Sequence, residues 1–540
     1  MPNTEYDIRS GNEAAAYAVL DAGVNAAYAY PGTPSTEIME RLSSEHKKAF
    51  WCANEKTAVE AALGVSFAGG RSFASMKHVG LNVAADPFMS AANLKINGGL
   101  VIVVADDPGM HSSQNEQDTR YYADFARLPC FEPSTVQEVY DMTRAGFGLS
   151  ERQNKIVVVR MVTRLSHSKG RLKRQSPETV PVKKSANSKE WNVVPAFGKL
   201  QWQRVLDNWP ALEKETEKSP YNVVVALGER SRTERIGVIT TGLAREYYLE
   251  LGKPLPHLHI SFYPLPGQKI KNFVSDLSEV YIIEEGYPYL ERYLRGIVSP
   301  ADLKIYGKLD GTFPLAGELN PDIIAKAFAP QADGHFDSAQ CPGLPKLENI
   351  PVRPPQLCQG CPHSGSFEFI KEAVEGTDVI LNADIGCYAL GSLPPYSLPL
   401  TLVDMGASVA MAKGAADLGK KALAIIGDST FLHSGVTGLM DCVAANAPVT
   451  IIILDNYTTA MTGGQPQLLP SQRLAEIVKA VGVLPENLYE LKPLAAEHKH
   501  NVEVLKKCLN TPAVSVIITR RECIETLRKR NKAKQAEQKI

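Results

Sequence analysis

The chain has 540 residues, of which 44% are hydrophobic and 22% are charged, and its 58 basic and 59 acidic residues give a formal net charge of −1. This composition is that of a globular protein, and it excludes whole-chain disorder, a footprint for nucleic acid or an anionic membrane, and a membrane span. Nine cysteines are too few for a disulfide scaffold, and the start shows no signal peptide, so we expect a cytoplasmic protein.

The first part of the chain, to about Ser168, alternates helical patterns with short apolar runs. Residues 11–22 and 57–68 have helical spacing, whereas GLVIVVA at 99–105 and KIVVVR at 155–160 are continuous apolar runs of strand length. Such runs are typical of strands that are buried on both faces of a parallel sheet. The pattern therefore predicts an α/β fold with doubly wound sheets.

Two more α/β patterns follow. A segment rich in Lys, Ser, Glu and Pro leads to strands expected at 236–240 and 279–284, and a second loop-rich segment leads to strands expected at 379–382, 422–426 and 449–454. We therefore predict three α/β domains. Their expected boundaries are 1–168, 229–330 and 356–526, with linkers at 169–228 and 331–355 and a charged tail at 527–540.

Two apolar runs of the third domain each end in oxygen donors. KALAII precedes Gly427, Asp428 and Ser429, and VTIIILDN ends in Asn456. Open α/β sheets bind ligands at the carboxyl ends of their strands, and a glycine there allows the backbone to approach a phosphate closely. Carboxylate and amide oxygens are the ligands that Mg²⁺ prefers. The two strand ends predict a magnesium and diphosphate site.

The segment from Gly427 to Asn456 resembles the thiamine-diphosphate signature, in which Gly-Asp-Gly is followed at a distance by Asn, although Ser429 stands at the third position. The run LDNYTTAMTGGQPQ resembles the 2-oxoacid:ferredoxin oxidoreductases in particular. This resemblance implies that Asp428, Asn456 and the backbone carbonyl of Thr458 bind Mg²⁺. The expected residues around thiamine diphosphate are Gly427, Asp428, Ser429, Asn456 and Gly406.

Glu55 begins an apolar helical pattern after Asn54, as in the His-Glu-Gln-type segments of many thiamine enzymes. The resemblance implies that its carboxylate hydrogen-bonds N1′ of the pyrimidine ring; the alternative is a surface acid that the helix dipole favours. The run YPGTPSTE at 30–37 resembles a Pro-x-Thr-Pro-Ser segment that lines the substrate site. Thr33 is therefore a candidate contact to the oxoacid, with a plain capped turn as the alternative.

Several longer strings are similar to the large subunit of indolepyruvate:ferredoxin oxidoreductase. They include MKHVGLNVAADP at 76–87, DDPGMHSSQNEQDTRYYA at 106–123 and EEGYPYLE at 284–291. The resemblance implies a pyrimidine-binding domain, a transketolase C-terminal-like domain and a diphosphate-binding domain, in that order. It also implies a smaller β subunit of the gamma type, and self-association that brings Glu55 to the Asp428 site.

Three further side chains are candidates for contact with the substrate. His78 and His433 could bind or protonate an intermediate, and Arg120 could pair bidentately with an oxoacid carboxylate. For each histidine the alternative is a hydrogen-bonded structural residue.

Four cysteines are candidates for one metal site. Cys358 and Cys361 form a Cys-x-x-Cys pair, which in a reduced cytoplasm is more often a metal or redox site than a structural one. With Cys387 and Cys523, the resemblance implies one [4Fe–4S] cluster near the thiamine. The alternatives are a reduced thiol pair in a turn, or zinc with His363 nearby.

The family's large subunit usually continues into a ferredoxin-like domain whose cysteine runs hold two more clusters. No such run is present in this sequence, so we expect ferredoxin or a separate ferredoxin-like subunit to carry the electrons onward. The expected activity is oxidative decarboxylation of an aryl 2-oxoacid such as indolepyruvate, with coenzyme A as co-substrate. The alternatives are a non-oxidative thiamine-dependent 2-oxoacid decarboxylase or ligase, and a non-catalytic scaffold.

Overall fold

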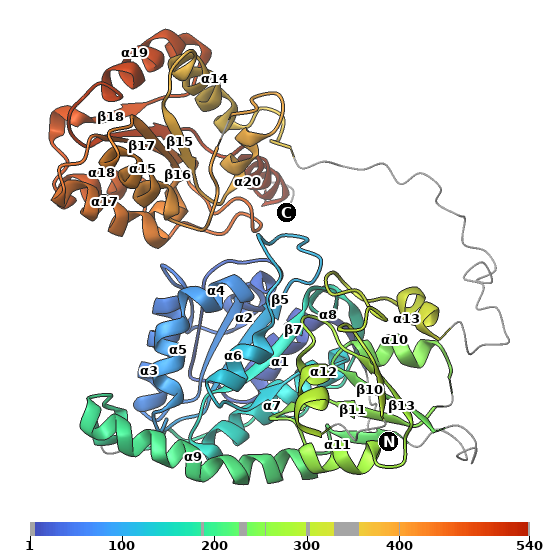
Figure 1. The fold of residues 1–540 in the computed structure, drawn as a ribbon. Coiled ribbons are helices and arrows are strands. Elements are labelled where there is room, and N and C mark those ends of the chain that lie inside the picture. Colours follow the sequence, from blue (N-terminus) through green and yellow to red (C-terminus); the bar gives the residue numbers. More distant parts are fainter. Residues whose placement is uncertain are drawn as a thin grey trace. The chain divides into compact units, whose positions relative to one another are not determined.

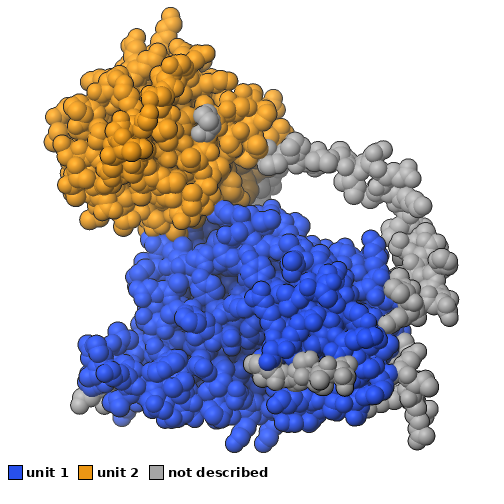
Figure 2. Space-filling view, viewed as in Figure 1, with its two compact units in different colours: residues 1–345 blue, residues 346–540 orange. Residues whose placement is uncertain are grey.

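The computed structural model describes residues 6–184, 188–225, 235–253, 255–298, 303–328, 356–398 and 400–537. The chain divides into two compact units, residues 1–345 and residues 346–540 (Figure 2). Each unit combines helices with largely parallel sheets (Figure 1), which confirms the predicted α/β class. The predicted linker at 331–355 lies outside the described residues, and the boundaries of the three predicted domains stay a prediction.

The larger sheet of the first unit has seven strands in the order β12-β6-β7-β5-β4-β2-β3, and its neighbouring strands are parallel except for β12 and β6. The two apolar runs of the sequence form its central strands, β5 (Leu100–Asp106) and β7 (Val157–Val162), in which every residue is buried. The other strands are β2 (Ala26–Ala29), β3 (Ala49–Trp51), β4 (Ser72–Lys77), β6 (Cys130–Phe131) and β12 (Phe262–Tyr263).

Helices cover both faces of this sheet because successive residues of a strand point to opposite faces. In β5, Val101 and Val103 pack in one hydrophobic cluster, whereas Ile102 and Val104 pack in another. The first cluster includes α1 (Gly11–Asp21), α2 (Thr36–Glu45) and α7 (Val136–Gln153), and the second includes α3 (Glu55–Phe67), α5 (Ala85–Ala92) and α6 (Thr119–Phe125). The remaining elements are β1 (Asp7–Ser10), paired with β8 (Lys169–Leu172), and α4 (His78–Val83), α8 (Thr163–His167) and α9 (Pro195–Lys218).

The second sheet of the first unit has five strands in the order β14-β13-β10-β11-β9. Ile239, Ile260 and Ile282 of this sheet belong to the same hydrophobic cluster as Ile102 and Val104 of the first sheet. The two sheets of this unit therefore share one core. The elements are β9 (Val223–Val225), β10 (Ile236–Thr241), β11 (His257–Ile260), β13 (Glu279–Ile283), β14 (Lys304–Tyr306), α10 (Ala244–Glu250), α11 (Gly267–Val274), α12 (Tyr289–Tyr293) and α13 (Pro321–Ala327).

Two fully buried arginines join the sheets of the first unit. Arg160 of β7 donates to Asp106 at the end of β5, 2.6 Å from Nε to Oδ2. Arg120 of α6 donates to Asp118 at 2.6 Å and to Glu284, which follows β13 in the second sheet, at 2.8 Å. Buried charges are tolerated only when each is paired. This arginine cluster (Arg120, Arg160, Asp106, Asp118 and Glu284) therefore ties the second sheet to the first.

The second unit contains a five-stranded sheet in the order β15-β16-β17-β19-β18, in which all neighbouring strands are parallel. The strands predicted at 422–426 and 449–454 are its central pair, β16 (Ala422–Gly427) and β17 (Val449–Asp455). The other strands are β15 (Ile380–Ala383), β18 (Leu488–Leu491) and β19 (Ser515–Arg520), and the longer helices are α14 (Pro362–Val374), α15 (Ala407–Asp417), α17 (Val436–Ala444), α18 (Gln472–Val481) and α19 (His498–Cys508).

The charged tail predicted at 527–540 belongs to helix α20 (Ile524–Glu537) as far as the structure describes it. Among the described residues, no helix combines the length and the apolar character needed to cross a membrane.

We expect the substitution Arg160→Gln to lower the free energy of unfolding of the first unit by about 3–5 kcal/mol, because it leaves Asp106 buried without its counter-charge. The matched control is Arg152→Gln on α7, whose side chain is 63% exposed and pairs with Glu215. A surface pair of this kind contributes at most about 1 kcal/mol. Urea unfolding followed by fluorescence measures both values, and equal losses in the two variants would contradict the structural role of the cluster.

Candidate functional site

Polar side chains gather at the carboxyl edge of the sheet in the second unit, where all of its parallel strands end. Asp428 follows β16 and Asn456 follows β17, and both are buried. Asp428 Oδ2 accepts hydrogen bonds from the backbone N–H groups of Asn456 and Tyr457, each at 3.0 Å. The fold thus places two of the predicted magnesium ligands side by side, with oxygen donors of the kind that Mg²⁺ prefers.

A second carboxylate, Asp455, is buried beside Asp428, and the sequence reasoning gave it no role. Its Oδ1 accepts from Ser471 Oγ at 2.8 Å, and its Oδ2 pairs with Arg520 at 3.2 Å. Burial and the charge of Asp455 raise the pKa of Asp428 well above its ordinary value. A divalent cation at Asp428 would offset the cost of burying this charge, so the residues present fit a cation. Its position just before Asn456 was the only sequence signal for Asp455.

The segment after Asn456 folds back over this strand end. Asn456 Oδ1 accepts from the backbone N–H of Thr458 at 3.1 Å, and Thr458 Oγ1 donates to the carbonyl of Gln465 at 2.9 Å. Ser429 Oγ lies 2.9 Å from Thr459 Oγ1. The loop that carried the family resemblance is therefore fixed to both strand ends, and the predicted ligand Thr458 lies within it.

Gly406 precedes α15 with a φ of 98°, a backbone conformation that side-chain-bearing residues rarely adopt. A Cβ atom at this position would lie 2.4 Å from Cβ of Ser434. The carboxylate of Asp384, which follows β15, accepts hydrogen bonds from the backbone N–H groups of Gly406 and of Ser408, the latter at 2.9 Å. Because Asp384 occupies this N–H group, Gly406 shapes the site through its close packing and does not present a free donor to a phosphate.

The four predicted cluster cysteines line one cavity of about 320 Å³ in the second unit. Cys358 and Cys361 lie in the turn before α14, joined by a backbone hydrogen bond of 2.9 Å, and Cys387 lies just after β15. The backbone N–H of Cys523 donates to the carbonyl of Asn456 at 3.1 Å. Asn456 also lines the cavity, so the thiols and the oxygen-donor site adjoin.

The thiols of this cavity influence one another's ionisation. Burial, with the charges of Cys358 and Cys523 adding to it, raises the pKa of Cys361 to about 11. Burial together with the charges of the other three cysteines raises the pKa of Cys387 to about 12. Bound metal would reverse this effect by stabilising thiolates. Within the described part of the chain, no group of three or more His, Cys, Asp and Glu side chains has the arrangement of a metal-ion site.

Two histidines of the second unit are buried. His433 lies in a π-helical turn (Phe431–Gly435) after β16, with Nδ1 2.5 Å from Ser434 Oγ. His363 lies in the first turn of α14, with Nε2 3.4 Å from Asn456 Nδ2, and burial lowers its pKa to about 4. His363 is therefore neutral near pH 7 and contacts a predicted metal ligand, a role that the sequence reasoning did not give it.

The carboxyl edge of the seven-stranded sheet carries the candidates of the first unit. Glu55, the first residue of α3, is 4% exposed, which makes it a buried acid and not the surface acid of the alternative interpretation. A Cβ atom at Gly80 would lie 2.4 Å from Glu55 Oε1. Only a glycine at residue 80 therefore allows the backbone to approach this carboxylate so closely. Gly32, in the predicted substrate turn, likewise packs against the side chain of Lys77.

Lys77 ends β4 and is a cation that the sequence reasoning left without a role. Its Nζ donates to the carbonyl of Ser112 at 2.9 Å, and burial lowers its pKa to about 8, against the opposing charges of Asp107 and Glu55. Asp107 accepts from Ser113 at 2.7 Å and from Ser112 N at 2.8 Å, which fixes the loop after β5. An ammonium group therefore faces this loop at the same sheet edge as Glu55.

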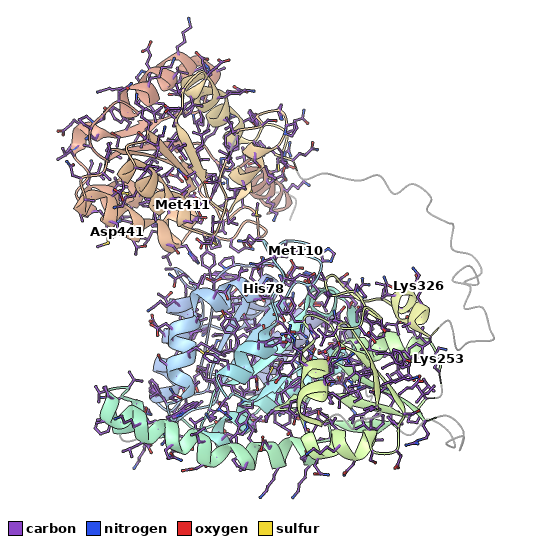
Figure 3. The ribbon with its side chains drawn as sticks, in the orientation of Figure 1. His78, Met110, Lys253, Lys326, Met411 and Asp441 are labelled. Atoms are coloured by element: carbon purple, nitrogen blue, oxygen red, sulfur yellow. The ribbon has the colours of Figure 1, made fainter. Side chains whose placement is uncertain are left out.

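The loop after β5 also contacts two predicted site residues. Ser112 Oγ donates to the carbonyl of Thr33 at 3.1 Å, and the carbonyl of Asn115 lies 3.0 Å from Nε2 of His78. His78 is buried, and its Nδ1 has no hydrogen-bond partner in the described structure. Figure 3 labels His78 together with Met110, an exposed residue of the same loop.

The prediction that Arg120 contacts the substrate is wrong, because it required an accessible side chain. The side chain is fully buried, and its guanidinium nitrogens bind Asp118, Glu284 and the carbonyl of Glu285 within the arginine cluster. These partners hold it inside the first unit, so it is not available to an oxoacid carboxylate. The sequence around Arg120 could not indicate its pairing with Glu284, which lies far away in the sequence.

Two family patterns match the chain. Residues 384–517 match the thiamine pyrophosphate enzyme C-terminal TPP binding domain, and residues 17–201 match the thiamine-diphosphate-binding domain of pyruvate flavodoxin/ferredoxin oxidoreductases. The chain is 37% identical to the indolepyruvate oxidoreductase subunit IorA of Methanothermobacter thermautotrophicus, over 95% of this chain and 86% of that protein. It is 38% identical to the IorA subunit of Archaeoglobus fulgidus, with the same two coverages.

A solved structure shares the fold. The 2-oxoglutarate:ferredoxin oxidoreductase from Magnetococcus marinus, with 2-oxoglutarate, coenzyme A and succinyl-CoA bound, superimposes with a TM-score of 0.51. The identity is 17%, and the match covers 61% of this chain and 66% of that chain.

We expect Gly406→Ala to lower the free energy of unfolding of the second unit by about 2 kcal/mol or more, because a side chain there is strained and meets Ser434. The matched control is Gly414→Ala in the interior of α15, where an added Cβ meets nothing within 4 Å. Helix propensity predicts that this control gains up to about 1 kcal/mol. Thermal unfolding of the two variants measures the difference, and a neutral Gly406→Ala would remove the argument for close packing.

Proposed function

Because the chain belongs to the family of indolepyruvate oxidoreductase IorA subunits, we propose that it oxidatively decarboxylates an aryl 2-oxoacid such as indolepyruvate. Family membership makes it a thiamine-diphosphate-dependent 2-oxoacid ferredoxin oxidoreductase and a subunit of a larger enzyme. In the finer proposal the chain is the large catalytic subunit, coenzyme A takes the acyl group and ferredoxin takes the electrons. The observation that carries the oxidative activity is the cavity of four cysteines beside Asn456.

The carboxyl edge of β16 and β17 fits the diphosphate end of the cofactor. Asp428, Asn456 and the carbonyl of Thr458 would hold Mg²⁺, and the buried carboxylate pair of Asp428 and Asp455 supports a cation there. When bound, thiamine diphosphate supplies a nucleophilic carbon and an acceptor for the electrons that remain after carbon dioxide leaves. The role of the chain at this end is to fix the diphosphate and to exclude water from it.

Glu55 is the residue that we propose for the pyrimidine end. A buried carboxylate can hold a proton at a ring nitrogen, and the backbone of Gly80 packs closely against the carboxyl group of Glu55. This role requires Glu55 to meet the Asp428 site of a second copy of the chain, so we include self-association in the proposal. A smaller subunit of the gamma type completes the proposed enzyme.

Lys77 replaces Arg120 as the cation that we propose for the substrate carboxylate. Its ammonium group lies at the sheet edge that carries Glu55, next to the turn that contains Thr33. With a pKa of about 8 it is mostly charged at pH 7 and loses that charge as the pH rises through 8. The oxoacid would displace the carbonyl of Ser112 from the ammonium group, and the hydroxyl of Thr33 would add a hydrogen bond.

The four cysteines would bind one [4Fe–4S] cluster, with one thiolate on each iron atom. Such a cluster would accept electrons one at a time beside the cofactor and pass them towards ferredoxin or a ferredoxin-like subunit. The hydrogen bond from the backbone N–H of Cys523 to the carbonyl of Asn456 supports a short path for electrons from the cofactor to the proposed cluster.

The test is an anaerobic assay of the chain copurified with its partner subunit, with viologen reduction as the readout. We expect reduction that depends on indolepyruvate and coenzyme A, and we expect Glu55→Gln to slow it by about 100-fold or more, as for loss of a general acid–base group. The control is Glu60→Gln on the exposed side of α3, which retains activity. Carbon dioxide release without viologen reduction would favour the non-oxidative alternative, and turnover of pyruvate alone would reject the aryl substrate.

Iron and sulfide analysis tests the cluster separately. We expect about four iron atoms per chain in the anaerobic protein and a dithionite-reduced EPR signal, both of them lost in Cys387→Ser. Cys442→Ser is the matched control, because Cys442 is a buried cysteine of α17 that packs in the hydrophobic core. Thiamine and Mg²⁺ bound without iron in the unmodified protein would show that the cluster assignment is wrong while leaving the cofactor assignment intact.

A further inference from the structure

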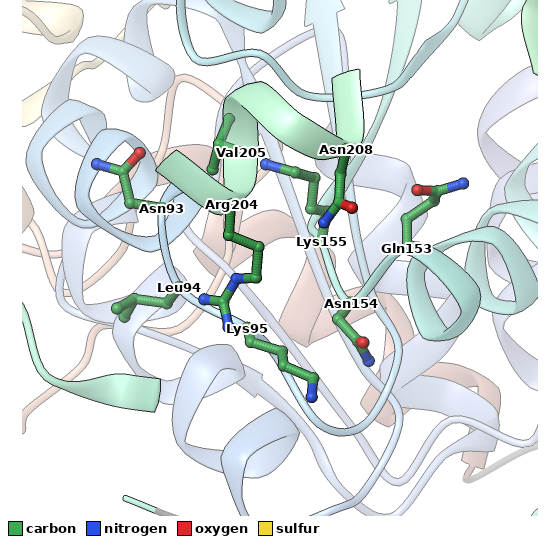
Figure 4. Close-up of a pocket in the computed structure, with 9 residues that line it drawn as sticks. All are labelled: Asn93, Leu94, Lys95, Gln153, Asn154, Lys155, Arg204, Val205 and Asn208. Atoms are coloured by element: carbon green, nitrogen blue, oxygen red, sulfur yellow. The ribbon is translucent and has the colours of Figure 1, made fainter. Parts of the chain in front are cut away.

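A second cavity, of about 230 Å³, lies in the first unit, and Figure 4 shows residues that line it. It lies at the edge of the seven-stranded sheet opposite to the edge that carries Glu55 and Lys77. Lys155 in its wall precedes β7 and therefore marks the amino end of that strand, whereas Glu55 follows the carboxyl end of β3 and Lys77 is the last residue of β4. The cavity is bordered by the segment after α5, which contributes Lys95, and by α9, which contributes Arg204.

Positive charge dominates the wall of this cavity. Figure 4 shows Lys95, Lys155 and Arg204 around one space. Lys155 is 8% exposed, and its Nζ donates to the carbonyl of Ala92 at 3.0 Å. Burial lowers the pKa of Lys155 to about 8, with the positive charges of Arg204 and Arg127 adding to the effect. A buried ammonium group whose charged neighbours have its own sign is a site that an anion would stabilise.

The existing partners of these cations leave hydrogen-bonding capacity unused. Glu190 lies 3.5 Å from Lys95 Nζ and 3.4 Å from Arg204 Nη1, which are long distances for charged hydrogen bonds. Nη2 of Arg204 is buried, and the described structure gives it no hydrogen-bond partner. A buried donor without an acceptor is destabilising, so an anion that supplies the acceptor would be favoured.

We propose that this cavity binds a phosphate group, either as inorganic phosphate or as part of a small phosphate monoester. The three cations exceed the charge of Glu190 by two, which matches a phosphate dianion better than a single carboxylate. The planar guanidinium of Arg204 can bind two phosphate oxygens at once. The volume is below that of typical cavities for drug-sized ligands, which suits a small anion and excludes a large cofactor.

Calorimetric titration of the full chain tests the proposal. The chain is first saturated with thiamine diphosphate and Mg²⁺, so that the phosphate probes do not report on the diphosphate site. Sodium phosphate and glycerol 3-phosphate are then titrated separately at constant ionic strength. We expect saturable binding of at least one probe, and binding of only one of the two identifies which source of phosphate the cavity accepts.

Substitutions identify the cavity as the binding site. We expect Arg204→Gln and Lys95→Gln each to weaken binding by tenfold or more, and Arg204→Lys to retain part of the affinity, with thermal unfolding confirming that the variants are folded. The matched control is Lys214→Gln, an exposed lysine of α9 outside the cavity, which keeps the affinity of the unmodified chain. Binding of neither probe, or equal affinity in all variants, would overturn the proposal, and neither result bears on the proposed oxidoreductase activity.

Discussion

The parallel alignment of neighbouring strands is the constraint on which the candidate site depends. Parallel strands all end at one edge of a sheet, so residues that follow different strands meet there although they are far apart in the sequence. In the second unit this places Asp428 and Asn456 in contact and brings Cys387 and Cys523 into one cavity. In the first unit the parallel alignment likewise brings Glu55, Lys77 and Asp107 to one edge of the sheet. Every proposed step of the chemistry relies on these two edges.

Both units contain buried carboxylates, and the groups that stabilise these carboxylates differ between the units. The first unit pairs each buried acid of its cluster with Arg120 or Arg160, which joins two sheets. In the second unit, Arg520 pairs with Asp455, while Asp428 keeps hydrogen bonds from backbone and amide groups. A closed network of paired charges is typical of structure, whereas a buried acid held by neutral hydrogen-bond donors is typical of a binding site.

The sequence predicted what is local or periodic. The apolar runs predicted the central strands of the sheets, and the short strings near Gly427 and Asn456 predicted the contact between their strand ends. Arg120 was misassigned because its partner Glu284 belongs to another sheet, and no local pattern indicates such a pairing. Asp455 and Lys77 were missed for a related reason. The role of a single charged residue at a strand end depends on the side chains around it, and these come from distant parts of the sequence. The ligand roles and domain boundaries stay predictions.

The shared core of the first unit has a consequence for dissecting the chain. A fragment that ended near residue 168 would contain six strands of the seven-stranded sheet but not β12 (Phe262–Tyr263). The hydrophobic cluster that includes Ile102 and Val104 would lose Ile239 and Ile282, and Arg120 would lose Glu284. Such a piece would present an apolar face and an unneutralised guanidinium to solvent, which favours aggregation. Crystallisation or domain-swapping work should therefore cut the polypeptide between the two compact units and keep the first two sheets together.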